Sequence, residues 1–557
     1  MQLENLVVYQ LYPKSFKDTT GSGTGDLRGV IEKMDYLKTL GVDMIWMNPF
    51  YPSPQNDNGY DVADYRAIDP KFGTMADFEE LVQAAEARDI GIMLDMVLNH
   101  TSTAHEWFQK ALAGDKKYQD YYYLRPAQAD GSLPTNWASK FGGPAWEPFG
   151  ETDQYYLHLY DVTQADLNWH NPEVRQELHD IVNFWLDKGV RGFRFDVLNV
   201  IGKPENMPDS TGGPGSDQEK SIYTDTPIVH EWIHELNQAT FGQREDIVTV
   251  GEMSSTTIPD GIKYTNPEDH ELSMIFNFHH LKVDYDHGEK WTKAPFDFIE
   301  LKRILNDWQS GMSAGHGWNA LFLNNHDQPR ANSRFGDVEN YPYATATMLA
   351  QTIHLLRGTP YIYQGEEIGM TNPNYTSIEQ YDDVESHNNY QILLDQGVSE
   401  ADALEILQQK SRDNSRTPMQ WDASPQAGFS KGEPWLEVAP NYQTVNVEQE
   451  LQKDGIFKYY QRLISLRKQE PTISQGSYQG LLLDHPQVMA FVRETAQQQL
   501  LVFSHFYGGQ VTVDLPETFK HRPFKELIGN GQVTVTDQQV TLDSYGTTAL
   551  LFEKSHD

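Results

Sequence analysis

The chain has 557 residues, which is long enough for one large domain with smaller satellite domains. It carries 43 lysines and arginines against 80 aspartates and glutamates, and this formal net charge of -37 argues against a nucleic-acid partner. There is no cysteine, so disulfides and thiol chemistry are excluded.

The N-terminal stretch MQLENLVVYQLYPKSF lacks the basic region, apolar core and cleavage site of a secretion signal. No apolar run reaches the roughly 18 residues that a membrane span needs. We therefore expect a cytoplasmic protein with neither a membrane partner nor a nucleic-acid partner. The sequence gives no prediction of the oligomeric state.

Eight short apolar runs recur along the first two thirds of the chain, most of them followed by an amphipathic helical pattern. The runs are 6–12, 43–49, 91–100, 192–197, 247–252, 273–278, 319–327 and 359–367. Eight strand–helix alternations predict an α/β fold, a parallel (β/α)8 TIM barrel closed by its helices.

The spacing of these runs also predicts the domain organisation. Residues 1–100 form the first part of the barrel, and 101–171, rich in Trp, Tyr, Gly and Pro, is too long for an ordinary connection. We expect 101–171 to be a small inserted domain after the third strand and 172–470 to complete the barrel. Short alternating strands with turn residues in 471–557 predict a C-terminal antiparallel β-domain, a β-sandwich.

The predicted strands end in polar residues, at the face where barrels of this kind carry their chemistry. These residues are Asn99, His100, Arg194, Asp196, Glu252, His326 and Asp327. A single buried carboxylate is more often a structural ion pair. Several charges at one rim cost several kcal/mol unless they are paired or used, so we interpret this set as a functional site.

The residue types at this rim limit the chemistry. The sequence has no His/Cys metal cluster, no glycine-rich phosphate loop after the first strand and no G-x-S-x-G motif. Paired carboxylates remain, and they favour glycoside hydrolysis, in which one carboxylate attacks the anomeric carbon and the other protonates the leaving oxygen.

Four motifs in order, DMVLNH (95–100), GFRFDV (192–197), VGEM (250–253) and NNHDQPR (324–330), resemble those of the α-amylase family, glycoside hydrolase family 13. The stretches QNDNGYDVADY, QADLNW and RDNSRTPMQW extend the resemblance over essentially the whole chain. The resemblance implies that the chain is an enzyme, a retaining glycoside hydrolase.

The resemblance assigns the chemical roles residue by residue. It implies that Asp196 is the nucleophile, held ionised by Arg194, and that Glu252 is the general acid/base. Asp327 matches the residue that stabilises the transition state.

The same resemblance implies a set of sugar contacts. His100 and His326 match the histidines that bind sugar hydroxyls, although a lone buried histidine is usually a satisfied core residue. Asp57 and Arg412 match the pair that closes the site in the exo-acting α-glucosidase branch, and Tyr60 matches its stacking tyrosine.

Within that branch, TVGEMSSTT (249–257), SMIFNFHHLKVDY (273–285) and YTDTPIVHEWIHELN (223–237) resemble the members that hydrolyse trehalose 6-phosphate to glucose and glucose 6-phosphate. An oligo-1,6-glucosidase or dextran glucosidase acting on isomalto-oligosaccharides is the first alternative. A transglycosylase with the same covalent intermediate stays open. A catalytically inactive sugar-binding or transporter-associated protein is disfavoured, because all three catalytic carboxylates are present.

A disaccharide phosphate brings close to two negative charges into an acidic protein, so a basic group must pair with it. Lys282 and Lys203 follow predicted strands at the catalytic face, and we expect them to bind the phosphate, although lone loop lysines are often only solvated. His279 and His280 are weaker candidates.

The loop DTTGSGTGD (18–26) occupies the place of a calcium loop in many members of the family. Asp18 and Asp26 remain, but Thr20 and Ser22 stand where carboxylate or amide ligands are usual. Calcium is selected by the number and charge of its oxygen ligands, so we expect no metal and no cofactor, with at most a weak calcium site in this loop.

Overall fold

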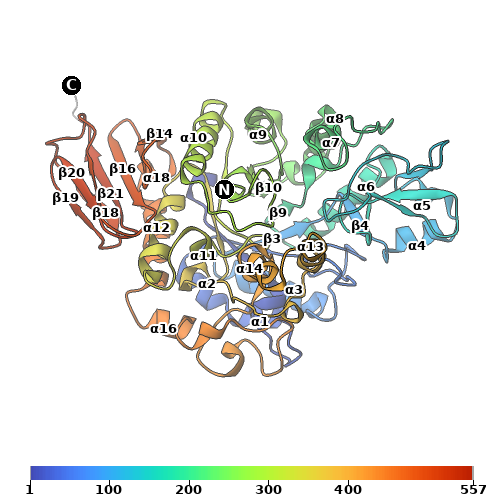
Figure 1. Ribbon diagram of the computed structural model, residues 1–557, viewed down its shortest axis with the longest axis horizontal. Helices are drawn as coiled ribbons and strands as arrows, with labels where there is room; N and C mark the ends of the chain where they lie inside the picture. Colours follow the sequence, from blue (N-terminus) through green and yellow to red (C-terminus); the bar gives the residue numbers. More distant parts are fainter. Residues whose placement is uncertain (1, 555–557) are drawn as a thin grey trace.

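The eight apolar runs form the parallel strands of one barrel in the computed structural model, which describes residues 2–554 (Figure 1). The strands are β1 (Val8–Leu11), β2 (Met44–Met47), β3 (Gly91–Met96), β9 (Gly192–Phe195), β10 (Val248–Glu252), β11 (Met274–Phe276), β12 (Ala320–Leu321) and β13 (Thr359–Tyr363). They pair in the order β11-β10-β9-β3-β2-β1-β13-β12, and a parallel bridge between Ile275 and Asn319 closes the ring. The predicted TIM barrel is confirmed.

The helices around the barrel begin at local capping signals. Thr74 and Asp77 form a capping box at α3 (Met75–Glu86), and Asn171 caps α6 (Pro172–Asp187) ahead of a proline in the first turn. The other large barrel helices are α2 (Met34–Leu40), α8 (Pro227–Ala239), α9 (Ile258–Thr265), α10 (Phe298–Ala314), α12 (Pro342–His354) and α17 (Ile456–Gln469). No helix within residues 2–554 is long and apolar enough to cross a membrane.

The segment between β3 and α6 folds away from the barrel, as the right-hand side of Figure 1 shows. β4 (His100–Ser102) pairs with β8 (Gln164–Asp166), and β7 (Gln154–Leu157) pairs with both β5 (Leu124–Pro126) and β6 (Trp146–Pro148). Two short helices, α4 (Glu106–Leu112) and α5 (Lys116–Gln119), complete it. The β4–β8 pair fixes the segment to the catalytic end of β3.

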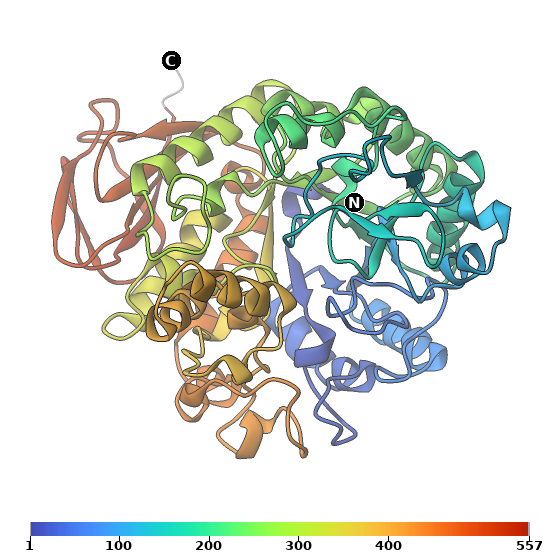
Figure 2. The ribbon, with the colours of Figure 1, turned by 45° about the vertical axis from the view of Figure 1, so that its right-hand side comes forward.

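A second excursion, which no sequence pattern separates from the barrel, follows β13 and precedes α17. It contains α13 (Val384–Asp395), α14 (Glu400–Lys410), α15 (Asp413–Arg416) and α16 (Val447–Leu451). Figure 2 shows its amber helices and the cyan inserted segment on either side of the central strands. Two loops from distant parts of the chain thus flank the catalytic end.

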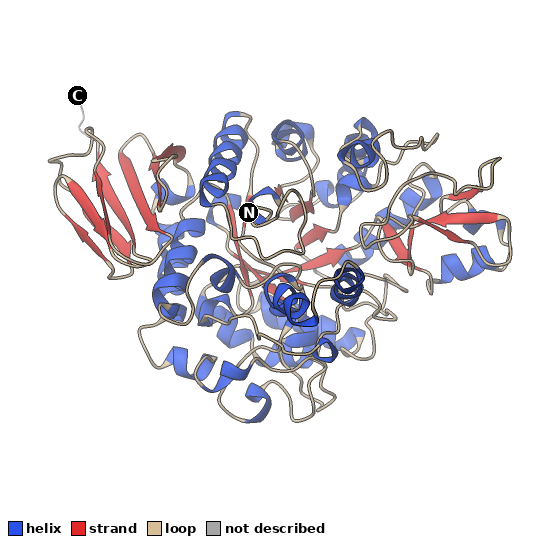
Figure 3. Cartoon of the chain, in the orientation of Figure 1, coloured by secondary structure: helices blue, strands red, loops and turns tan. Residues whose placement is uncertain are grey.

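The C-terminal strands form a separate pair of antiparallel sheets, at the opposite end of the molecule from the inserted segment (Figure 3). One sheet has β14 (Ser477–Leu481), β15 (Val488–Glu494), β16 (Gln498–His505), β21 (Thr547–Glu553) and β18 (Lys525–Gly529); the other has β17 (Val511–Asp514), β20 (Gln539–Leu542) and β19 (Val533–Val535). Apolar side chains such as Val488, Phe503 and Val540 fill the space between them. The predicted C-terminal β-domain is confirmed.

Buried cations join this β-domain to the barrel through backbone carbonyl groups. Arg493 of β15 donates to Leu355 O at 2.7 Å, just past the C-terminal end of α12, and beside it Arg467 of the barrel helix α17 donates to Leu356 O at 3.3 Å. Lys302 of α10 donates to Leu482 O at 2.9 Å. The free carbonyls and the negative dipole end of a helix favour cations, so these contacts fix the joint.

Candidate active site

A fully buried guanidinium, that of Arg194 at the end of β9, lies at the centre of the catalytic end of the barrel. Its Nη1 lies 2.7 Å from Asp196 Oδ1 and 2.9 Å from Asp95 Oδ1, and its Nη2 lies 2.7 Å from Glu252 Oε2. β9 pairs in parallel with β3 and β10, so the ends of these strands lie side by side. The residues predicted as nucleophile and acid/base therefore meet on one cation.

The carboxyl groups of Asp196 and Glu252 behave as one unit. Burial, and then the negative charge of Glu252, raise the pKa of Asp196 well above its ordinary value, while Arg194 opposes this shift. A negative charge on either carboxyl group disfavours a second negative charge on the other, because the two lie on the same guanidinium. A retaining glycosidase needs one ionised and one protonated carboxyl group.

The backbone directly after the predicted nucleophile is strained. Val197 adopts a left-handed conformation with φ 39° and ψ 42°, which is rare for a β-branched residue. Its N–H donates a hydrogen bond to Glu252 Oε2 at 3.1 Å. This turn therefore links the two catalytic loops, and strain of this kind is typical of functional sites.

Asp327, six residues past the end of β12, contacts two arginines and a histidine. Its Oδ1 lies 2.9 Å from Arg416 Nη2 and 3.4 Å from Arg412 Nη1, and its Oδ2 lies 3.1 Å from His326 Nε2. Burial alone would raise the pKa of Asp327, but these neighbours hold it below its ordinary value. Burial also lowers the pKa of His326 well below its ordinary value, so the arginines supply the positive charge. Asp327 is thus a fixed negative charge.

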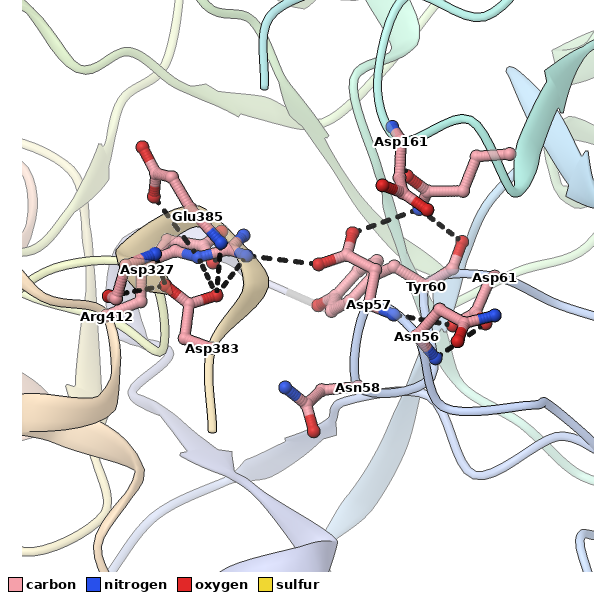
Figure 4. A network of polar contacts seen from close by, with 12 residues as sticks. Asn56, Asp57, Asn58, Tyr60, Asp61, Asp161, Asp327, Asp383, Glu385 and Arg412 are labelled. Atoms are coloured by element: carbon pink, nitrogen blue, oxygen red, sulfur yellow. Dashed lines mark hydrogen bonds and ion pairs between the residues drawn. The ribbon is translucent and has the colours of Figure 1, made fainter. Parts of the chain in front are cut away.

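Arg412 closes one side of the site (Figure 4). Its Nη2 lies 3.1 Å from Asp57 Oδ1 and 2.5 Å from Asp383 Oδ1, and its Nε lies 3.3 Å from Glu385 Oε2. The Asp57–Arg412 pair that the resemblance implied is therefore present. Asp383 and Glu385 come from the excursion after β13 and orient the guanidinium of Arg412.

Tyr60, His100 and His326 lie beside these charged groups. The Tyr60 ring stacks on His326 with centroids 5.2 Å apart and an 8° interplanar angle, and its hydroxyl donates to Asp95 Oδ2 at 2.6 Å. His100 Nε2 lies 3.1 Å from the carbonyl oxygen of Tyr60. Burial lowers the pKa of His100 to about 4, so both histidines are neutral near pH 7 and can bind hydroxyl groups.

Comparisons with known proteins agree with this geometry. The α-amylase catalytic-domain family matches residues 10–476, and the C-terminal domain family of the α-amylase SusG matches 488–548. A trehalose-6-phosphate hydrolase of Bacillus subtilis is 52% identical over 97% of this chain and 96% of its own length. An oligo-1,6-glucosidase of Parageobacillus thermoglucosidasius is 45% identical over 96% and 95%. The crystal structure of Bacillus licheniformis trehalose-6-phosphate hydrolase superposes with a TM-score of 0.95 at 51% identity, covering 99% of both chains.

The chain belongs to the α-amylase family of glycoside hydrolases. The family match covers nearly the whole barrel, including both excursions that flank the catalytic end. The residues that the resemblance picked out at this end, from Asp57 to Arg412, lie together in the structure. Their individual roles stay predictions.

Lys203 is an exception, because the structure contradicts its prediction as a phosphate ligand. Its side chain is fully buried, with Nζ 2.6 Å from Asp166 Oδ2, and it also donates to Asn99 Oδ1. The charge is already neutralised, and a phosphate has no access to it. Lys203 instead ties the loop after β9 to β8 of the inserted segment. The sequence could not show this partner, because Asp166 lies 37 positions earlier.

Lys282 is different, because its ammonium group has no such partner. It lines a cleft of about 400 Å³ with His279, Thr256 and Trp308, and burial followed by the charge of Lys220 lowers its pKa. Within residues 2–554, no carboxylate lies in ion-pair contact with Lys282. His280, by contrast, is buried against Phe322 O and is not available to a ligand.

Lys140, in the inserted segment, was not predicted and belongs to the same basic group. Its Nζ lies 5.5 Å from the ring centroid of Tyr223, which ends α7 (Asp217–Tyr223), one turn after Lys220. Burial, then the charges of Lys220 and Lys282, lower the pKa of Lys140 to about 8. Three lysines from three segments therefore converge beside the catalytic end.

The carboxylates of the loop 18–26 accept hydrogen bonds from donors of the chain itself. Asp18 accepts hydrogen bonds from Thr20 N at 2.9 Å, Gly23 N at 2.8 Å and Ser430 Oγ at 2.6 Å, and Asp26 caps α1 (Leu27–Glu32). A metal ion would have to displace these donors. No cluster of three or more candidate metal-ligating side chains occurs among the described residues.

Proposed function

We propose that this chain is a retaining, exo-acting α-glucoside hydrolase that cleaves trehalose 6-phosphate to glucose and glucose 6-phosphate. The observation that carries the glycosidase chemistry is the pair of carboxyl groups, Asp196 and Glu252, held on Arg194 at 2.7 Å each. The trehalose-6-phosphate hydrolases among its relatives support the substrate.

In the proposed reaction, a carboxylate oxygen of Asp196 attacks the anomeric carbon of the non-reducing glucose while Glu252 gives its proton to the glycosidic oxygen. The bond to the leaving sugar breaks, and a covalent glucosyl-enzyme forms. Glu252 then removes a proton from water, which attacks the same carbon and releases Asp196. Asp327, a fixed negative charge, stabilises the positive charge that develops on the glucose ring in both steps.

The exo-acting mode follows from the contacts of Arg412. Its ion pairs with Asp57 and Asp383 bridge the loop after β2 and the excursion after β13. A sugar chain could not continue past this bridge, so we propose that the site accepts one glucose residue at its closed end. His100, His326 and Tyr60 would bind this residue.

The phosphate requires positive charge at the other end. Lys140, Lys220 and Lys282 supply it in this proposal, in place of Lys203. The cluster adjoins the site through aromatic rings. Lys140 Nζ lies 5.5 Å from the ring centroid of Tyr223, which belongs to the same apolar cluster as Tyr160, and the ring centroid of Tyr160 lies 5.5 Å from that of His100. Lys220 also lies 4.0 Å from Asp217 Oδ1, whereas Lys140 and Lys282 could give charge-assisted hydrogen bonds that favour a phosphorylated sugar over an unphosphorylated one.

Oligo-1,6-glucosidase activity is the second candidate, because a relative of that activity is also similar over nearly its full length. We further propose that the enzyme acts in the cytoplasm and needs no metal cofactor.

Comparing kcat/KM on trehalose 6-phosphate, trehalose and isomaltose tests the proposal. We expect trehalose 6-phosphate to be preferred by a wide margin, with α-glucose released first. A preference for isomaltose would replace the proposed substrate with that of the second candidate. Transfer products in place of free glucose would identify a transglycosylase.

A further inference from the structure

Asp225, between α7 and α8, holds together the two loops that follow the catalytic carboxylates. Asn199 Nδ2 donates to Asp225 Oδ1 at 3.1 Å and to the carbonyl oxygen of Ser254 at 2.9 Å. In the other direction, the backbone N–H of Asp225 donates to Asn199 O at 3.0 Å. The Tyr264 hydroxyl donates to the same Asp225 Oδ1 at 2.6 Å.

Asn199 and Ser254, the two residues that this network joins, lie on different catalytic loops. Asn199 lies in the 3-10 turn Leu198–Val200, three residues after Asp196, and Ser254 lies two residues after Glu252. The side-chain amide of Asn199 thus bridges the nucleophile loop and the acid/base loop, and Asp225 orients that amide. Asn199 is fully buried, so water does not replace a lost partner easily.

Asp225 is also held in an uncommon backbone conformation, with φ 52°. Left-handed residues outside glycine carry strain and persist where the surrounding contacts determine them. Here the conformation allows Asp225 to contact Asn199 twice. Its backbone N–H donates to the Asn199 carbonyl oxygen, and its carboxylate accepts from the Asn199 side-chain amide. No group of Asp225 contacts the catalytic carboxylates directly.

The loop after Glu252 has few contacts that fix its position. β10 ends at Glu252, and its backbone hydrogen bonding with β11 ends one residue later, where Met253 N donates to Phe276 O. From Ser254 onward the loop depends on other contacts, of which Asn199 supplies the first and His279, at Thr256 O, the next. A shift at Ser254 would therefore be transmitted to the carboxyl group of Glu252.

We infer that Asp225 is a positioning residue for the acid/base Glu252, acting through Asn199 on the loop that follows β10. The inference rests on the proposed roles of Asp196 and Glu252, but not on the phosphorylated substrate. It predicts that proton transfer is damaged more than the attack by Asp196, because the carbonyl group of Ser254, which Asn199 holds, lies on the loop that follows Glu252.

The leaving group provides the test. Phenyl α-glucoside needs a proton on its leaving oxygen, whereas 2,4-dinitrophenyl α-glucoside leaves without one. In Asp225→Ala we expect kcat/KM on the phenyl glucoside to fall by about tenfold to a hundredfold, the loss expected for a misplaced catalytic group, and to fall little on the dinitrophenyl glucoside. Azide, which needs no general base, should restore turnover of the dinitrophenyl substrate as glucosyl azide.

Two further variants separate positioning from folding. Asp225→Asn keeps an oxygen acceptor for Asn199 and Tyr264 and should retain near wild-type kcat, with KM unchanged. Asn199→Ala leaves the Asp225–Tyr264 contact in place and should show the same leaving-group dependence as Asp225→Ala, without a further loss in the double variant. Glu231→Ala, which removes an exposed carboxylate on α8, is the matched control.

Equal losses on both aryl glucosides, an unchanged kcat in Asp225→Ala, or an Asp225→Asn variant as damaged as Asp225→Ala would overturn the inference. A wild-type enzyme that hydrolyses neither aryl glucoside would instead contradict the proposed function, so the two failures are distinguishable.

Discussion

Two regions of this molecule bury cations in opposite ways. At the catalytic end, Arg194 and Arg412 are surrounded by carboxylates. At the joint with the C-terminal domain, Arg467, Arg493 and Lys302 are surrounded by backbone carbonyls, and within residues 2–554 none of them has an ion-paired carboxylate. Both arrangements satisfy the hydrogen bonds of a buried cation, but only the first concentrates opposite charges.

The pKa shifts express this difference. Burial alone would lower the pKa of Arg194, but Asp95 and Glu252 raise it well above its ordinary value. At the joint, burial lowers the pKa of Arg467 to about 9. Backbone carbonyl groups are enough to satisfy a buried cation, as the joint shows. The catalytic end instead has several carboxylates around each arginine, and we interpret this concentration of charge as the mark of the site that performs chemistry. Substitutions at the two regions should affect different properties.

The largest expected effect is on activity at the catalytic end. Asp196→Asn should lower kcat by about four orders of magnitude or more, as removal of a nucleophile does in other enzymes with covalent intermediates. The melting temperature should not fall, because the substitution removes one of the three buried carboxylates that repel one another around Arg194. Near-normal turnover, or release of β-glucose by the wild type, would contradict the retaining mechanism.

A substitution at the joint should lower the stability of the protein and leave its activity unchanged. Arg493→Ala leaves the carbonyl oxygens of Leu355 and Gly476 without their donor and opens a cavity, so it should destabilise the protein by about 3–5 kcal/mol. Urea unfolding followed by circular dichroism measures this loss. The folded variant should keep its kcat/KM, and a variant that loses activity without losing stability would show that the joint communicates with the site.

Lys140 and Lys282 test whether half-buried cations that have no ion-paired carboxylate within residues 2–554 also bind substrate. Lys282→Ala should lower kcat/KM on trehalose 6-phosphate by about tenfold to a hundredfold, the range for one charge-assisted hydrogen bond, and Lys140→Ala should act similarly. Activity on an aryl α-glucoside should be unchanged. Added salt should weaken trehalose 6-phosphate binding in the wild type more than in the variants. If both variants keep the wild-type preference, the phosphate binds elsewhere on the rim.

The sequence was sufficient for the barrel and for the residues at the strand ends. Each strand is a short apolar run with a clear boundary, and residues such as Asp196 and Glu252 lie at its end, where the parallel fold itself brings them together. Asp57 and Arg412 were found only through the resemblance, because they are 355 positions apart.

The parts that sequence reasoning missed have no periodic signal. Asp383 and Glu385 lie in the acidic stretch YDDVESHNN, which is indistinguishable from a solvated surface until the chain after β13 folds back over the site. Lys140 lies in a glycine-rich loop of the inserted segment. Lys203 was misassigned because its partner, Asp166, lies in another segment. A charge and its distant partner are paired by tertiary structure alone.

A smaller effect is expected at Glu366, a carboxyl group that lines a small cavity with His354 and Arg330 between the barrel and its outer helices. Burial raises the pKa of Glu366 to about 8, above the roughly 4.3 of the unfolded chain. Folding therefore takes up a proton between these two values, and the stability that Glu366 contributes falls as the pH rises through this window. Glu366→Gln should raise the melting temperature at pH 8 by about 1–4 °C relative to the wild type, and change it little at pH 4. An equal change at both pH values would show that Glu366 is ionised in the folded protein.

The smallest effect is expected from metal removal. The carboxylate of Asp18 already accepts hydrogen bonds from Thr20, Gly23 and Ser430, and these contacts hold its pKa below the ordinary value although burial would raise it. The loop is thus ordered by donors of the chain itself, which occupy the oxygen lone pairs that a calcium ion would need. Dialysis against a chelator should leave kcat/KM and the melting temperature unchanged. Ser430→Ala, which removes one donor, should lower the melting temperature whether or not calcium is added. A large loss of stability on chelation that calcium restores would show that Asp18, Asp26 and backbone carbonyls suffice for a metal site.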